Sequence, residues 1–223
     1  LGDVYKRQIQ FDLKRRWVCF LTGITLSGFG VAMTTRAGIG TTPISSVPYV
    51  LSMISPLSIG MWTLLMNVFF VLIQWLILRK EFPRHQLLQI PATFLFGMII
   101  DLGMFVFRPL VSDFYPYQIL MLIGGSALLA AGIALQVMTD LLCLPGDAIV
   151  KIVSEKLHWN FGKLKVSFDV TLTTTAIVIS LVSLSALRGV REGTVAGAFC
   201  VGTLVALFMP RLRFARKLCY VRK

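Results

Sequence analysis

Six apolar stretches, each long enough to cross a bilayer, take up most of this chain. A transmembrane helix needs about 20 mostly apolar residues. Six such helices and their loops leave no room for a separate soluble domain in 223 residues. We expect the spans at about residues 17–35, 58–78, 86–107, 117–142, 165–187 and 193–208. The sequence therefore predicts an all-α integral membrane protein with six transmembrane helices.

Composition and the placement of charge agree with this class. Hydrophobic residues (AVILMFWYC) make up 56% of the chain and charged residues 14%, whereas a soluble domain carries about 25% charged residues. The formal net charge of +12 does not indicate nucleic-acid binding. The basic residues lie between the apolar stretches and at the two ends, so no soluble face carries a phosphate-binding stripe.

The basic residues also predict the orientation of the chain. If both termini are cytoplasmic, all but four of the 22 Lys and Arg lie on the cytoplasmic side; the exceptions are Arg36, Arg108, Arg188 and Arg191. This asymmetry is the positive-inside pattern. We therefore expect a multi-pass protein of a bacterial cytoplasmic (inner) membrane, surrounded by the lipid bilayer, with cytoplasmic N and C termini.

Two segments between spans are too apolar for solvated loops and too interrupted by Gly and Pro to span. The first follows span one, and we expect a short re-entrant or interfacial helix from Pro43 to about Met53. Pro43 suits a first helical turn and Thr42 its N-cap. The second follows span four, with a short helix expected between Gly146 and Leu157. Each segment thus resembles a broken helix.

The two segments belong to an internal repeat. Shifting the chain by 102 positions places Gly23 on Gly125 and Pro43 on Pro145. The same shift places Asn67 on Asp169, and a shift three residues longer places Gly97 on Gly202. Three spans per half is an odd number, so the second half enters the membrane from the opposite side. We expect two inverted three-helix repeats, each with a short broken helix after its first span.

This register divides the chain into four parts. We expect an N-terminal tail at 1–16, a first three-helix repeat at 17–110, a second at 117–210 and a basic cytoplasmic tail at 211–223. Residues 1–8 read LGDVYKRQ, which we interpret as a translated sequencing-adapter artefact and leave out of fold reasoning.

The chain resembles the bacterial YczE/YitT-type family of small membrane proteins. The resemblance rests on Gly23 to Pro43 (GITLSGFGVAMTTRAGIGTTP), Thr93 to Gly103 (TFLFGMIIDLG) and Leu144 to Lys156 (LPGDAIVKIVSEK). These motifs are Gly and Pro spacings and not catalytic signatures, and they extend over residues 17–210. The resemblance implies a multi-span bacterial inner-membrane protein and no settled substrate or activity.

Asn67 and Asp169 are the first candidate site residues. A charged side chain within a span costs about 2.5–3.5 kcal/mol when it faces lipid, so Asp169 is expected to face the interior or a water-filled cavity. We expect a substrate, cation or proton site between the halves. The alternative is a packing role near the membrane edge, with Asp169 paired to Lys163 or Lys165.

The starts of the two short helices supply the other candidates. Arg36 and Thr42 precede the first, where helix-start amides and a guanidinium suit a carboxylate or phosphate; the alternative is a capped interfacial helix with Arg36 reaching headgroups. Asp140 and Asp147 flank the second and could bind a cation or move a proton. The alternative for Asp147 is a simple helix cap.

Inverted repeats with broken segments in corresponding positions indicate a secondary transporter. We therefore expect a small permease-like protein that works by alternating access, with an unknown small-molecule or ion substrate. The alternatives are a substrate-binding membrane subunit of a larger uptake complex and a non-transporting scaffold or regulator. We expect no enzyme activity, cofactor, metal or nucleic-acid partner, since HExxH, Ser/His/Asp and acidic metal-binding patterns are missing from the sequence. The chain could also form a homodimer.

Overall fold

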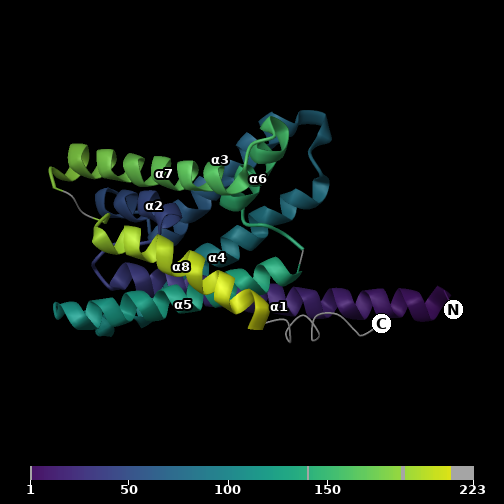
Figure 1. The fold of residues 1–223 in the computed structure, drawn as a ribbon, viewed down its shortest axis with the longest axis horizontal. Helices are drawn as coiled ribbons and strands as arrows, with labels where there is room; N and C mark the ends of the chain where they lie inside the picture. The colour runs from purple at the N-terminus through teal and green to yellow at the C-terminus, as the bar shows by residue number, and fades with distance from the viewer. Residues whose placement is uncertain (1, 140, 187–188, 212–223) are drawn as a thin grey trace.

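The fold is a bundle of long helices with two short helices set among them (Figure 1). A computed structural model describes residues 2–139, 141–186 and 189–211. The long helices are α1 (Gly2–Arg36), α3 (Ile59–Leu78), α4 (Gln89–Val106), α5 (Tyr115–Thr139), α7 (Phe161–Leu184) and α8 (Glu192–Arg211). The short helices are α2 (Pro43–Ile54) and α6 (Pro145–Leu157), and short 3-10 turns occupy Arg79–Glu81, Arg84–Leu88 and Arg108–Leu110.

Six of these helices are long and apolar enough to cross a membrane, which confirms the expected number of spans. Helix α1 begins at Gly2, so the segment predicted as a tail is continuous with the first helix. Helix α7 begins at Phe161, one turn before the predicted start, because Asn160 caps it by accepting a hydrogen bond from the Lys163 amide.

Large apolar side chains cover the outside of the bundle. Phe105 is 73% exposed, Phe199 75% and Val182 79%. In water such a surface would be unfavourable, whereas lipid tails solvate it. The surroundings of the six spans are therefore a bilayer.

The centre of the bundle is the pair α1 and α5, which lie close along much of their length. Glycines on both helices allow the approach: a Cβ on Gly30 would lie 2.5 Å from the Leu129 amide nitrogen and 2.8 Å from the Gly125 carbonyl oxygen. Small residues at helix contacts are the usual means of close packing in membranes. Phe20, Ile24, Ile100 and Leu129 form the adjacent apolar core.

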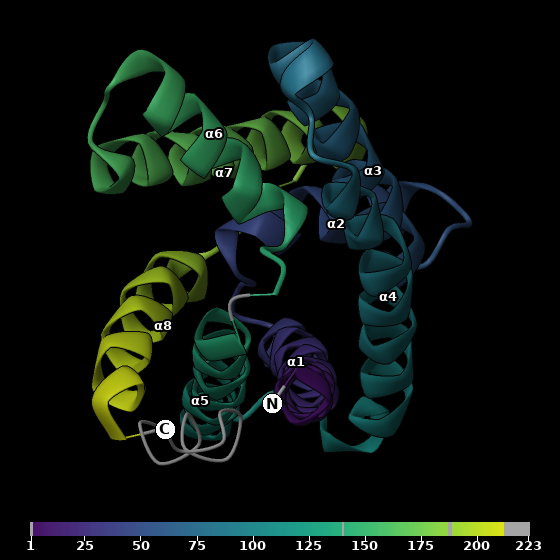
Figure 2. The same cartoon turned by 90° about the vertical axis from the view of Figure 1, so that its right-hand side faces the viewer.

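The other helices are arranged around this pair. Helix α4 packs on α1 and α8 packs on α5, while α2 contacts α3 and α7, and α6 contacts the same two helices. Figure 2 shows α6 and α7 together on one side, with α8, α5 and α1 in a row below them. The two short helices, whose positions the sequence predicts, thus each contact at least one long helix from the N-terminal part of the chain and at least one from the C-terminal part.

Candidate functional site: a polar centre between two short helices

Helices α2 and α6 meet at their first turns. A Cβ on Gly146 would collide with the Cδ1 atom of Ile44, so these residues are in direct contact. Both helices carry Pro at the start, Pro43 in α2 and Pro145 in α6. Because proline lacks an amide hydrogen and has a helix-compatible φ, it suits this position. The meeting point joins segments that lie far apart in the sequence.

Polar side chains are buried around this meeting point and along the neighbouring helices. Helix α2 and the loop before it contribute Thr41, Thr42, Ser45 and Ser46; α3 contributes Thr63, Asn67 and Gln74; α4 contributes Gln89 and Thr93. Buried polar groups in a membrane interior are costly unless they form hydrogen bonds. We call these nine residues the polar centre.

Gln74 connects the polar centre to α6. It is 0% exposed, and its Nε2 donates to the Pro145 carbonyl oxygen at 3.1 Å and to Gln89 Oε1 at 3.3 Å. Gln74 Oε1 is buried with no hydrogen-bond partner among the described residues, and so is the Thr63 hydroxyl. Buried atoms of this kind are few in folded proteins. The polar centre therefore retains unused hydrogen-bonding capacity.

Asn67 lies inside the bundle, as the sequence predicts for an interior polar residue. Its side chain is 4% exposed, and Nδ2 donates to the Thr63 carbonyl oxygen at 2.9 Å. Thr63, Asn67 and Gln74 are spaced four and seven residues apart and share one face of α3. That spacing is the sequence signal that points to Gln74 and Thr63, which the sequence interpretation did not include.

Asp169 and Asp147 share one lysine. The Lys165 ammonium lies 3.0 Å from Asp147 Oδ1 and 2.9 Å from Asp169 Oδ1, and 5.7 Å from the centre of the Phe168 ring. Two carboxylates and one ammonium leave one negative charge in excess. The ion pair with Lys165 is the one that the sequence raised as an alternative for Asp169. We call Asp147, Lys165 and Asp169 the charged triad.

The structure changes the interpretation of Asp147. The N-cap of α6 is Leu144, and Asp147 lies in the first turn with its carboxylate paired to Lys165, so the capping alternative is wrong. Its carboxylate still sits where the partial positive charge of a helix start is favourable. The spacing of Lys165 and Asp169 suggests their pairing, whereas only the fold brings Asp147 to them.

Arg36 and Thr42 are engaged in local contacts. Arg36 Nη2 donates to the Met104 carbonyl oxygen at 2.7 Å and so connects the end of α1 to α4. Thr42 is the N-cap residue of α2, as predicted, but its hydroxyl donates to Ser45 Oγ at 3.0 Å and makes no capping hydrogen bond. Asp140 lies outside the described residues, so its predicted role stays a prediction.

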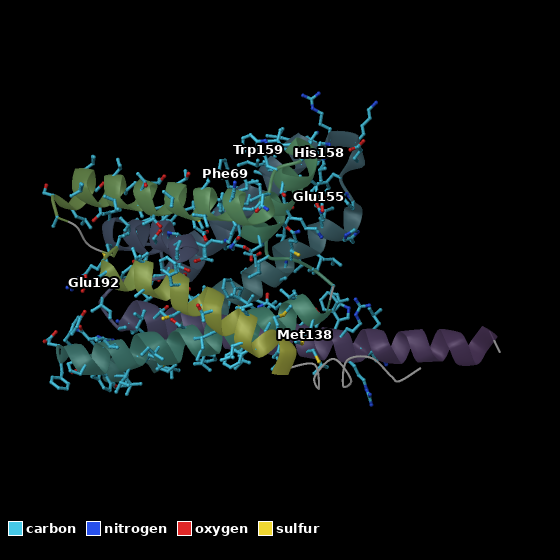
Figure 3. The ribbon with its side chains drawn as sticks, in the orientation of Figure 1. Phe69, Met138, Glu155, His158, Trp159 and Glu192 are labelled. Atoms are coloured by element: carbon cyan, nitrogen blue, oxygen red, sulfur yellow. The ribbon has the colours of Figure 1, made fainter. Side chains whose placement is uncertain are left out.

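Charged and aromatic residues mark the two ends of the bundle. Figure 3 shows Glu155, His158 and Trp159 together near the end of α6, whereas Glu192 lies at the opposite end of the molecule. The turn at the first end is held by the Ser154 hydroxyl, which donates to the Trp159 carbonyl oxygen at 2.7 Å. The charged triad lies on α6 and α7, whose connecting turn is at this first end.

Comparison with known proteins gives relatives without a described activity. A family of unknown function (DUF6198) matches residues 14–210. "Uncharacterized protein YyaS" of Bacillus subtilis (strain 168) is 24% identical over 196 residues, which are 87% of this chain and 92% of that protein. "Uncharacterized membrane protein YczE" of the same organism is 25% identical over 166 residues, 74% of this chain and 75% of that protein.

These matches confirm the resemblance to YczE that the Gly and Pro motifs indicate. No solved structure matches the chain.

Proposed function

Because this chain belongs to the DUF6198 family, a family of unknown function, we propose its role from its own structure: a small secondary transporter that works by alternating access between two inverted halves. The proposed orientation places both termini in the cytoplasm, following the distribution of Lys and Arg. The proposal assigns the polar centre to substrate binding and the charged triad to coupling. It includes no catalytic step.

Reciprocal contacts between α1 and α5 support the two related halves. Gly23 packs on Gly132, and Gly30 packs on Gly125. In the 102-residue register, Gly125 is the equivalent of Gly23 and Gly132 is the equivalent of Gly30. When two units are related by a two-fold axis, contacts between them occur in matched pairs. If Gly23 contacts the equivalent of Gly30, then Gly30 contacts the equivalent of Gly23. Along α1 the residue number rises from Gly23 to Gly30, whereas along α5 the contacted residue falls from Gly132 to Gly125. The two helices are therefore antiparallel, as inverted halves require.

The single observation that carries the proposal is the contact between Ile44 and Gly146. These residues are equivalents of each other, and a residue touches its own equivalent only next to a two-fold axis. The starts of the two short helices therefore meet between the halves. Transporters with inverted repeats bind their substrates in this kind of position, at broken helices near the midplane.

Helix pairs follow the same correspondence. The pair α1–α4 has its equivalent in α5–α8, and the pair α2–α7 has its equivalent in α6–α3; all four pairs are in contact. Because α2 packs on a helix of the second half and α6 on a helix of the first, the short helices cross between the halves. A movement of one half against the other would move both helix starts.

The charged triad has an uncharged equivalent in the first half. Asp147 corresponds to Ser45, Lys165 to Thr63, and Asp169 to Asn67. The uncharged set is buried, each residue at 4% exposure or less, while the charged side chains are 26–42% exposed. Each half thus places three polar residues at the same positions, and the second half adds the charge that coupling to a cation or proton requires.

Substrate binding is assigned to Gln74, which lies beside the start of α6. Its Oε1 is unpaired among the described residues and can accept a hydrogen bond. Coupling is assigned to Asp169. If a proton or cation neutralises Asp169, Lys165 keeps a one-to-one pair with Asp147, so the triad can alternate between two charge states without an unpaired lysine.

The test is a thermal-shift screen of the purified protein against alkali cations, amino acids and vitamins. We expect at least one compound to raise the unfolding temperature, because a ligand that binds only the folded state stabilises it. The Gln74→Leu variant should lose the shift for a substrate, and Asp169→Asn should lose the shift for a coupling cation. Thr171→Ala, which alters an exposed threonine on α7, is the matched control and should keep both shifts.

A shift that survives in both Gln74→Leu and Asp169→Asn would show that binding takes place elsewhere and would contradict the site. Loss of the shift is meaningful only in variants that elute as folded protein in size-exclusion chromatography.

A further inference from the structure

The two halves differ at one joint between helices. In the first half, α3 and α4 touch at two glycines: a Cβ on Gly97 would lie 2.6 Å from the Gly60 carbonyl oxygen, and a Cβ on Gly60 would collide with the Gly97 carbonyl oxygen. The equivalents in the second half are Gly162 and Gly202. Among the described residues, nothing lies within 4 Å of a Cβ on Gly202, and only Asn160 Oδ1, at 3.3 Å, lies near one on Gly162.

A carboxylate reinforces the closed joint. Asp101 of α4 accepts hydrogen bonds from the Gly60 amide at 2.8 Å and from the Ser58 hydroxyl at 2.6 Å. It therefore binds the first turn of α3, where a negative charge is favourable. Ala206 is the equivalent of Asp101 in the longer register and cannot make such bonds. Among the described residues, α8 therefore has no carboxylate at this position that could bind the first turn of α7.

The helices of the second joint, α7 and α8, pack on other partners. Helix α7 packs on α2. Helix α8 packs on α5 instead, as Figure 2 also shows. Trp159, three residues before Gly162, lies near the end of the molecule opposite Glu192 (Figure 3).

Two exposed glycines within helices need a reason. Gly202 lies in the interior of α8, where glycine lowers helix stability by about 1 kcal/mol relative to alanine. In this conformation neither Gly162 nor Gly202 supports a close helix contact. Their equivalents Gly60 and Gly97 do support one. A conformation in which α7 packs on α8 through Gly162 and Gly202 would give these glycines the same role.

We propose that the α3–α4 and α7–α8 joints are two gates that open in alternation as the protein exchanges between two conformations. The conformation described here is closed at Ser58–Asp101 and open at Gly162–Gly202. This proposal rests on the proposed transport function and specifies its conformational step. In the orientation proposed above, the open joint faces the cytoplasm. The opposite conformation closes Gly162 onto Gly202 and separates Gly60 from Gly97, as expected when inverted halves exchange conformations.

The test is disulfide trapping in native membranes of the double variant Gly162→Cys/Gly202→Cys. Because a disulfide requires Cα atoms within about 7 Å, oxidation should join these positions only in the opposite conformation. Peptide mapping by mass spectrometry identifies the 162–202 link in the presence of native cysteines, and the single variant Gly162→Cys reports any pairing with Cys200. The matched control is Gly162→Cys/Val195→Cys, since Val195 lies near the start of α8, at the other end of the molecule.

We expect the 162–202 link at a yield at least several-fold above the control pair. Adding Asp101→Ala, which removes the attachment at the closed joint, should raise the yield further; Ser58→Ala is the milder variant if Asp101→Ala reduces folded protein. A yield equal to that of the control pair in folded protein, with and without these changes, overturns the proposal. Disulfide formation does not require a bound ligand. A 162–202 link without any thermal shift would therefore support the conformational exchange and contradict the proposed transport function.

Discussion

Replacing Lys165 with methionine is expected to cost the folded protein about 2 kcal/mol. The Lys165 ammonium is the only group found within ion-pair distance of Asp147 and Asp169 among the described residues, so its removal leaves two neighbouring carboxylates unpaired in a membrane helix bundle. Breaking a fully buried ion pair costs roughly 3–5 kcal/mol, and the partial exposure of these side chains lowers the cost. The fraction of protein that stays monodisperse in size-exclusion chromatography after heating measures the effect.

Two further variants separate charge from packing at this position. Asp169→Asn keeps a one-to-one pair between Lys165 and Asp147, and we expect a loss below about 1 kcal/mol. The triple variant Asp147→Asn/Lys165→Met/Asp169→Asn removes all charge and should recover most of the stability that Lys165→Met loses. A triple variant as unstable as Lys165→Met would show that the lysine acts through packing and not through its charge.

Replacing Gly30 with leucine is expected to have the largest effect on folding. A Cβ at this position would lie 2.5 Å from the Leu129 amide nitrogen and 2.8 Å from its Cα. These are backbone atoms of α5, so relief requires the two central helices to separate. Overpacking typically costs 1–3 kcal/mol even where side chains can move, and the cost here should be greater. We expect the yield of folded protein from membranes to fall by an order of magnitude or more.

The matched control is Gly202→Leu. It makes the same chemical change in a transmembrane helix, but no atom of the described residues lies within 4 Å of the added Cβ. We expect this variant to be extracted and to elute like the parent protein. Equal yields of folded protein from Gly30→Leu and Gly202→Leu would contradict the close packing of α1 on α5.

Much of the fold can be predicted because long apolar helices depend on local sequence. A span needs only its length and apolar character, and the interruptions at Pro43 and Pro145 mark the short helices. The packing partners are less predictable. That α2 packs on α7, and that Gly146 meets Ile44, depends on contacts far apart in the chain, which periodicity does not report.

The candidate site shows the same limit. Asn67 is predicted because the 102-residue register pairs it with Asp169, whose charge is costly within a span unless it faces the interior. Lys165 was considered only as a partner for Asp169, because their spacing on one helix is visible in the sequence, whereas its contact with Asp147 arises from the packing of α6 on α7. The role of Gln74 is not predicted from the sequence. Gln74 lies near the end of an apolar span, where a polar side chain is typical of the membrane interface.

If the two halves are inverted across the membrane, the equivalent residues Leu57 and Trp159 lie on opposite sides of it. Both side chains are exposed, and each lies between a short helix and the next long helix. The measurement is labelling of Leu57→Cys and Trp159→Cys in intact cells with a membrane-impermeant maleimide, with the parent protein as background. Inverted halves predict that Leu57→Cys is labelled in intact cells and Trp159→Cys only after permeabilisation. Labelling of both from the same side would show that the two halves are not inverted.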